Sequence, residues 1–146
     1  MNGLSDGTAA PSFNLPSLDG ENVSLQQFLG RRVLLVFSDP SCGPCNSLTP
    51  RLERLSRRTP DIQIIMVSRG DVVVNRKKVA QHGLTFPIVL QRRWEVSRRF
   101  GMFATPIAYY IDQKGIIRGN IAVGLEQILR LLVAAAITGL LDETQL

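Results

Sequence analysis

The chain has 146 residues, of which 45% are hydrophobic and 20% are charged, and its formal net charge is +5. This size and composition indicate one soluble globular domain, and they exclude a small scaffold held together by disulfides. The basic residues come in small groups without an aromatic-rich nucleic-acid motif. We therefore interpret them as solvated surface and expect no nucleic-acid partner.

The N-terminal segment, residues 1–10, has neither a basic start nor an apolar run, so we expect a flexible lead and no signal peptide. The domain itself is expected over 11–146. Apolar residues alternate with polar ones at 13–15 and again at 23–25, on either side of a turn at 18–20. This pattern predicts a β-hairpin near the start of the domain.

A continuous apolar run at 32–37 predicts a strand that is buried on both faces of a sheet. The stretch SDPSCGPC follows at 38–45. A helix is expected to begin near Gly43 or Pro44, and the Thr-Pro pair at 59–60 should end it.

The rest of the chain alternates strands and helices and then closes with a hairpin and a helix. The predicted strands are 62–67, 85–90, 107–111 and 116–123, and the predicted helices are 72–81, 94–100 and a C-terminal one from Leu125. This order predicts a three-layer α/β domain with a mixed central sheet and no internal linker.

Both cysteines of the chain, Cys42 and Cys45, lie between a buried strand and a helix start. Free N–H groups and the positive dipole end of the helix should favour the thiolate of Cys42 over its thiol. The two-residue spacing returns Cys45 to the side of Cys42, while Gly43 allows close approach and Pro44 stiffens the turn. We expect Cys42 to attack disulfides and Cys45 to resolve the product.

A closed zinc site usually needs four ligands, but the chain offers only these two cysteines and one histidine, His82. No second pair of histidines or cysteines occurs at ligand spacing. We therefore predict no metal and no cofactor, and we interpret His82 as a structural residue at a helix end.

Three segments carry a resemblance to a known family. They are GTAAPSFNL at 7–15 with LDG and VSL at 18–25, the strand at 32–37 with the motif CGPC at 42–45, and 100–115, which contains Thr-Pro and YYIDQKG. Together they resemble the thioredoxin superfamily, and within it the TlpA/ResA-like and redoxin (AhpC/TSA-type) branch. The resemblance covers nearly the whole chain and implies a thioredoxin fold with an N-terminal β-hairpin extension.

The resemblance also implies that the bond between Thr105 and Pro106 is cis and packs against the dithiol. The backbone of Thr105 could then pair with an extended substrate, and its side chain would keep metal away from the cysteines. From the residues alone, the preferred interpretation of Pro106 is an ordinary trans proline that begins an edge strand.

The sequence departs from this family at several positions. Ser41 stands where many thioredoxins have tryptophan, and the one tryptophan, Trp94, is interpreted as a packing residue. Val36 and Leu48 stand where related proteins keep a buried acid that takes the proton from the second cysteine. Asp39 is the nearest carboxylate, and we consider it either a proton-transfer or tuning group, or a cap of its own loop.

The leading functional hypothesis is a thiol–disulfide oxidoreductase that acts on protein disulfides or dithiols and is served by an upstream electron donor. We expect a monomer, and the resemblance favours an extracytoplasmic protein on the periplasmic side over a cytoplasmic one. It also allows a membrane anchor outside this chain.

Two alternatives stay open. A peroxiredoxin-like thiol peroxidase would have an antioxidant role, but the usual Pro and Thr or Ser before the cysteine are replaced by Leu35 and Asp39. A non-enzymatic docking module would keep the cysteine pair as a structural disulfide and use the basic surface for binding.

Overall fold

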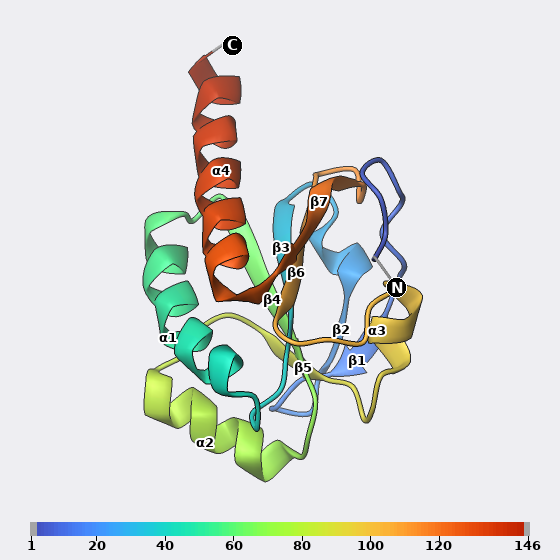
Figure 1. The fold of residues 1–146 in the computed structure, drawn as a ribbon, viewed down its shortest axis with the longest axis vertical. Coiled ribbons are helices and arrows are strands. Elements are labelled where there is room, and N and C mark those ends of the chain that lie inside the picture. The colour runs from blue at the N-terminus through green and yellow to red at the C-terminus, as the bar shows by residue number, and fades with distance from the viewer. Residues whose placement is uncertain (1–2, 145–146) are drawn as a thin grey trace.

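A five-stranded mixed sheet forms the centre of the molecule in this computed structural model, which describes residues 3–144 (Figure 1). The strands are β3 (Arg32–Ser38), β4 (Ile62–Ser68), β5 (Ile88–Leu90), β6 (Ile107–Ile111) and β7 (Ile117–Val123). Across the sheet their order is β5-β4-β3-β6-β7, with β3, β4 and β5 parallel and β6 and β7 antiparallel to their neighbours. The mixed sheet that the sequence predicts is confirmed.

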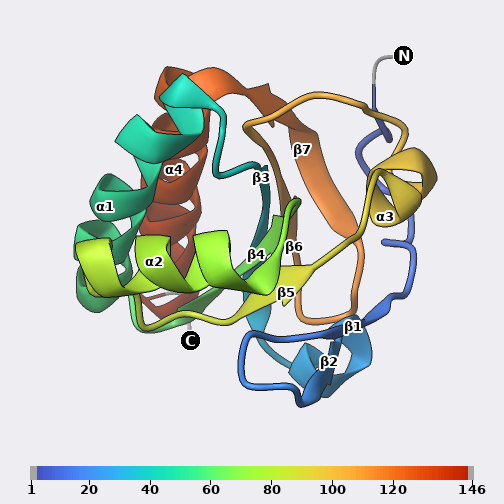
Figure 2. The ribbon, with the colours of Figure 1, turned by 90° about the horizontal axis from the view of Figure 1, so that it is seen from below.

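Helices cover both faces of this sheet. They are α1 (Gly43–Arg58), α2 (Val72–His82), α3 (Glu95–Arg99) and α4 (Gly124–Thr144). Figure 2 shows α1, α2 and α4 on one side of the strands and the short α3 on the other. The three-layer α/β architecture is therefore confirmed.

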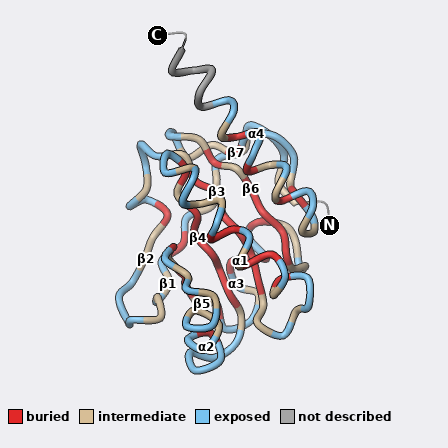
Figure 3. Tube along the Cα trace, turned by 90° about the vertical axis from the view of Figure 1, so that its left-hand side faces the viewer, coloured by how far each residue is buried: buried red, intermediate tan, exposed pale blue. Residues whose placement is uncertain are grey.

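The central strand β3 is apolar along its length because both of its faces are covered. Val33, Leu35 and Phe37 point into the core cluster on the α3 side. Leu34 and Val36 alternate with them and point into the cluster beneath α1 and α4. Figure 3 shows the resulting buried strands enclosed by exposed helices and loops.

The N-terminal hairpin consists of β1 (Asn14–Pro16) and β2 (Asn22–Ser24), followed by the 3-10 helix η1 (Leu25–Phe28). Its apolar side chains Phe13 and Leu25 are buried in the cluster on the α3 side. A bridge between Ser17 and Val89 joins the hairpin to the edge strand β5. The predicted hairpin extension is confirmed, and it covers an edge of the sheet that would otherwise be open.

Residues 3–10, within the expected lead, form hydrogen bonds to the body of the domain. The amide of Gly3 donates to the Gly101 carbonyl (3.2 Å), that of Leu4 to the Tyr109 hydroxyl (2.9 Å), and that of Gly7 to the Ile117 carbonyl (2.8 Å). The first two residues of the expected lead lie outside the described residues. Because of these bonds, we propose that the domain includes residues 3–10. Main-chain bonds of this kind leave no pattern in the side chains, so the sequence does not reveal them.

The strand expected at 85–90 is shorter in the structure and starts at Ile88. The amide of Thr85 donates to the Glu53 carboxylate at 2.7 Å and so does not pair with a neighbouring strand. Pro87 has no N–H to contribute to a sheet. Because of both features, β5 starts at Ile88 and not at residue 85.

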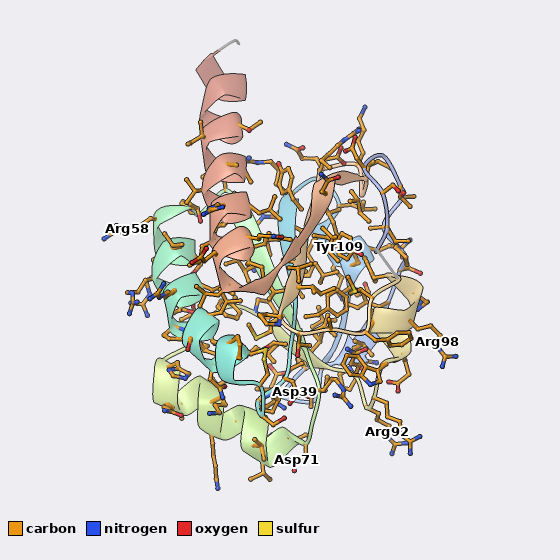
Figure 4. All side chains as sticks on the ribbon, viewed as in Figure 1. Asp39, Arg58, Asp71, Arg92, Arg98 and Tyr109 are labelled. Carbon is orange, nitrogen blue, oxygen red and sulfur yellow. A yellow bond between two sulfur atoms is a disulfide. The ribbon has the colours of Figure 1, made fainter. Side chains whose placement is uncertain are left out.

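Basic side chains are distributed over separate sides of the molecule. Figure 4 shows Arg58 at one side, on α1, and Arg92 and Arg98 at the opposite side, around α3. Within residues 3–144, no helix combines the length and the apolar character that a membrane span requires.

Candidate active site

The SDPSCGPC stretch connects the end of β3 to the start of α1, as the sequence predicts. Cys42 is the residue that caps the helix, with an extended backbone at φ −88° and ψ 120°. Its Sγ accepts the amide N–H of Cys45 at 3.2 Å. A free N–H of the first helical turn is therefore directed at the sulfur, an arrangement that stabilises negative charge there.

Cys42 and Cys45 form a disulfide with their Cα atoms 5.2 Å apart. The two sulfurs have different surroundings, because Cys45 is 1% exposed while Cys42 is half-buried at the surface. Gly43 and Pro44, between them, are exposed in the first turn of α1. A partner molecule can approach Cys42 more easily than Cys45.

The peptide bond between Thr105 and Pro106 is cis, as the family resemblance implies. Pairing of Phe37 in β3 with Ile107 in β6 brings this bond beside the end of β3. The Thr105 carbonyl oxygen lies 3.7 Å from Cys42 Sγ. Two segments more than sixty residues apart thus meet at the accessible sulfur.

The Asp39 carboxylate forms hydrogen bonds within its own loop and an ion pair with Arg69. Its carboxylate accepts from the Ser41 amide (2.9 Å) and hydroxyl (2.7 Å), and it pairs with Arg69 Nη1 at 3.0 Å. Burial favours the neutral acid, but these bonds outweigh it and hold the pKa of Asp39 below its ordinary value. A carboxylate held in this way is a weak base, so its contacts favour the loop cap over the proton-transfer role.

The interior behind the disulfide has no acid at the two positions where related proteins carry one. Val36 and Leu48 are fully buried in the apolar cluster beneath α1. A cavity of about 20 Å³ lies nearby, lined by Asn46 and Thr49 of α1 and by His82 of α2. This volume has room for about one water molecule.

Three residues that the sequence does not single out as a group lie in contact: Arg69, Trp94 and Phe103. The Arg69 guanidinium lies 3.9 Å from the centre of the Trp94 ring, and the Trp94 and Phe103 rings pack edge to face with their centroids 5.8 Å apart. Trp94 was expected only to pack. No local spacing signals this group, because its members come from three loops that only the fold brings together.

Within the described part of the chain, no group of three or more histidine, cysteine, aspartate or glutamate side chains is placed to hold a metal ion.

Comparison with known proteins identifies the family of the chain. A sequence model of the AhpC/TSA family matches residues 7–120. The thioredoxin-like protein YneN of Bacillus subtilis is 32% identical over 84% of this chain and 74% of its own length. ResA of Geobacillus thermodenitrificans, a thiol-disulfide oxidoreductase, is 32% identical over 77% of this chain and 66% of its own.

The methylamine utilization protein MauD of Paracoccus denitrificans is also 32% identical, over 91% of this chain and 66% of its own length. The chain thus spans about two thirds to three quarters of these relatives.

Solved structures with the same fold cover most of the chain. A Chlorobium tepidum structure described as a thiol:disulfide interchange protein DsbE superimposes with a TM-score of 0.82 at 26% identity, over 91% of this chain and 98% of the other. The thioredoxin domain of a Bacteroides vulgatus thiol-disulfide oxidoreductase gives a TM-score of 0.80 at 22% identity, over 91% and 99%. The second match shows the fold alone.

Proposed function

The chain belongs to the AhpC/TSA family, in the TlpA/ResA-like branch of the thioredoxin superfamily, and we propose that Cys42 and Cys45 exchange disulfides with partner proteins. It is a thiol–disulfide oxidoreductase of thioredoxin type. The observation that carries the proposal is the disulfide at the start of α1, with one half-buried and one buried sulfur beside the cis-proline loop.

In the proposed reaction, the Cys42 thiolate attacks one sulfur of a partner disulfide and forms a mixed disulfide, releasing the other partner sulfur as a thiolate. The Cys45 thiolate then attacks Cys42 Sγ and releases the second partner sulfur as a thiolate, and the two partner thiolates take up protons from solvent. The domain is oxidised by two electrons and the partner is reduced by two. The reverse sequence oxidises a partner dithiol.

The surroundings of the two sulfurs support this order of attack. Cys42 is accessible and its sulfur accepts a helix N–H, and both features favour a nucleophilic thiolate. Cys45 is buried within reach of Cys42 and is suited to an intramolecular second step. We assign a tuning role to Gly43 and Pro44: a side chain at Gly43 would meet nothing within 4 Å, so this position leaves room for a partner, while Pro44 restricts the backbone of the turn.

We assign substrate docking to Thr105 and Pro106. Their loop lies beside Cys42, and the half-buried Thr105 can offer its backbone to an extended partner segment. Asp39 would tune the site only indirectly, by holding the loop that carries Cys42.

Protein disulfides are the substrate class that the relatives' names imply. We further propose that the domain works outside the cytoplasm, as a monomer supplied by an upstream electron donor, with any membrane anchor outside this chain.

A trapping experiment tests the order of the two cysteines. The reduced Cys45→Ser variant, mixed with glutathione disulfide, should accumulate a stable adduct on Cys42 because the resolving thiol is absent. Cys42→Ser should form its adduct at least about tenfold more slowly, because its remaining thiol is buried. Intact-protein mass spectrometry over time measures both rates.

Equal adduct rates in the two variants would show that the assigned order is wrong. Wild-type protein that reacts with hydrogen peroxide far faster than with glutathione disulfide would favour the peroxidase alternative. Wild-type protein that reacts with neither, together with unchanged cellular function after Cys42→Ser, would favour the docking module.

A further inference from the structure

Arg69, Trp94 and Phe103 form a continuous row of side chains, which we call the aromatic rim. Arg69 follows β4, Trp94 precedes α3, and Phe103 lies in the loop that leads to the cis-proline. Neither ring belongs to the two core clusters of the domain. The packing of the core therefore does not account for this pair of aromatic residues.

Arg69 fixes one end of the aromatic rim to the cysteine loop. Its Nη1 pairs with Asp39 at 3.0 Å, and its Nε donates to the Arg93 carbonyl at 3.0 Å. Asp39 in turn accepts from the amide of Ser41, the residue before Cys42. Figure 4 shows Asp39 and Arg92 towards the same lower end of the molecule, where β3 finishes.

Phe103 fixes the other end to the docking loop. It stands two residues before Thr105, whose carbonyl oxygen lies 3.7 Å from Cys42 Sγ. Its ring meets Trp94 edge to face at an interplanar angle of 87° and is still 41% exposed. Arg69 thus contacts the loop that carries Cys42, Phe103 belongs to the loop whose Thr105 lies at Cys42 Sγ, and part of the Phe103 ring stays exposed.

The charges of the aromatic rim indicate what it can bind. The positive charge of Arg69 is already balanced by Asp39, and its guanidinium face is covered by Trp94. The carboxylate of Glu95 is likewise occupied by the amides of Arg92 and Arg93. The open part of the rim is therefore aromatic ring surface, which binds apolar or aromatic side chains by stacking and burial.

We propose that the aromatic rim selects partners with an apolar or aromatic residue next to the cysteine attacked by Cys42. This proposal rests on the proposed function. An extended partner segment paired with the Thr105 backbone runs past Phe103, so a neighbouring side chain can cover that ring. Ser41 offers no aromatic surface before the first cysteine, so the aromatic contact in this proposal comes from Phe103 and Trp94.

Two disulfide-linked homodimeric peptides test the proposal: Gly-Phe-Cys-Gly and Gly-Ser-Cys-Gly, which differ only before the cysteine. The reduced wild-type domain should react with the phenylalanine peptide about tenfold faster. Phe103→Ala should bring the ratio of the two rates close to one. The control Leu29→Ala, at an exposed apolar site (56%) before the opposite end of β3, should keep the wild-type ratio. Stopped-flow oxidation of the domain gives each rate.

A wild-type ratio near one, or a ratio that Phe103→Ala leaves unchanged, would overturn the proposal while leaving the exchange activity established. Failure of wild type to react with either peptide would instead overturn the proposed function.

A second measurement does not depend on turnover, because Trp94 is the one tryptophan of the chain. In Cys45→Ser trapped with each peptide, quenching of Trp94 fluorescence by acrylamide should fall about twofold with the phenylalanine peptide only. Equal quenching with both peptides would contradict docking on the aromatic rim.

Discussion

Glu53 is a carboxylate in α1 that is only 2% exposed, and it illustrates how one residue can join distant segments. It accepts the amide of Thr85 at 2.7 Å and the Thr85 hydroxyl at 2.8 Å, and it pairs with Arg57 at 3.1 Å. Burial favours its neutral form, but the Thr85 and Arg57 bonds outweigh burial and hold the pKa of Glu53 below its ordinary value. Glu53 therefore stabilises the loop that precedes β5.

Replacing this carboxylate should weaken the fold without touching the cysteines. Glu53→Gln should lower the free energy of unfolding by about 2 kcal/mol, because an amide cannot accept all three bonds. The control Glu126→Gln, whose side chain is 82% exposed in a 3.8 Å pair with Arg130, should change it by less than about 0.5 kcal/mol. Urea denaturation of the oxidised protein measures both, and similar losses would contradict the role of Glu53.

At the scale of the element, α2 is held to the body by polar contacts. Val72, Val73 and Val74 are exposed, and the buried position of the helix is Asn75, which is 4% exposed. The Asn75 amide nitrogen donates to the carbonyls of Arg69 (3.1 Å) and Asp71 (2.9 Å), and its oxygen accepts from Ser68 at 2.6 Å. One side chain thus links α2 to the end of β4.

Removing this link should loosen α2 more than the rest of the domain. Asn75→Ala should cost about 2–3 kcal/mol of stability, since it leaves buried polar groups without partners. Hydrogen exchange should accelerate more in α2 than in α1. Lys77→Ala, on the exposed side of the same helix, serves as the control. Equal acceleration in both helices would show that Asn75 does not act as a local anchor.

At the scale of the whole molecule, carboxylates join its parts at three places. Asp39 links the cysteine loop to Arg69, Glu53 links α1 to Thr85, and Asp112 links β6 to Arg118 in β7. Burial opposes the charge in each case, but the partner bonds outweigh it and lower the pKa of all three groups. Each partner bond is therefore strongest when the carboxylate is ionised.

The stability of the molecule should accordingly depend on pH on the acid side. Because the folded-state pKa values are lowered, the unfolded chain takes up protons first as the pH falls. The stabilisation is complete above the unfolded values near 4, and it is lost as the pH falls through the lower folded values. Denaturation midpoints should be level from about pH 7 to 5 and then decline.

The decline should be shallower in Glu53→Gln, which has lost one of the three titrating groups. A midpoint that stays level down to pH 3, or an unchanged slope in this variant, would contradict the account.

Hydrophobic periodicity, together with glycine and proline at the ends of segments, was sufficient to predict most of the helices and strands. The runs at 32–37 and 62–67 became β3 and β4 with only one residue added to each, because strands buried on both faces are apolar throughout. β5 was predicted too long, because the contact of Thr85 with Glu53 is invisible to local patterns. The main-chain hydrogen bonds of residues 3–10 are equally invisible to local patterns, so the sequence predicts only a lead over 1–10.

The sequence by itself determined the dithiol: its spacing, its place between strand and helix, and the different positions of its two sulfurs all follow from neighbouring residues. Only the tertiary structure decided what surrounds it. The fold set Thr105 beside Cys42, engaged Asp39 with Arg69, and brought Trp94 and Phe103 together. A few neighbouring residues determine where a helix starts or a buried strand runs. A binding surface instead depends on which loops the order of strands in the sheet places side by side.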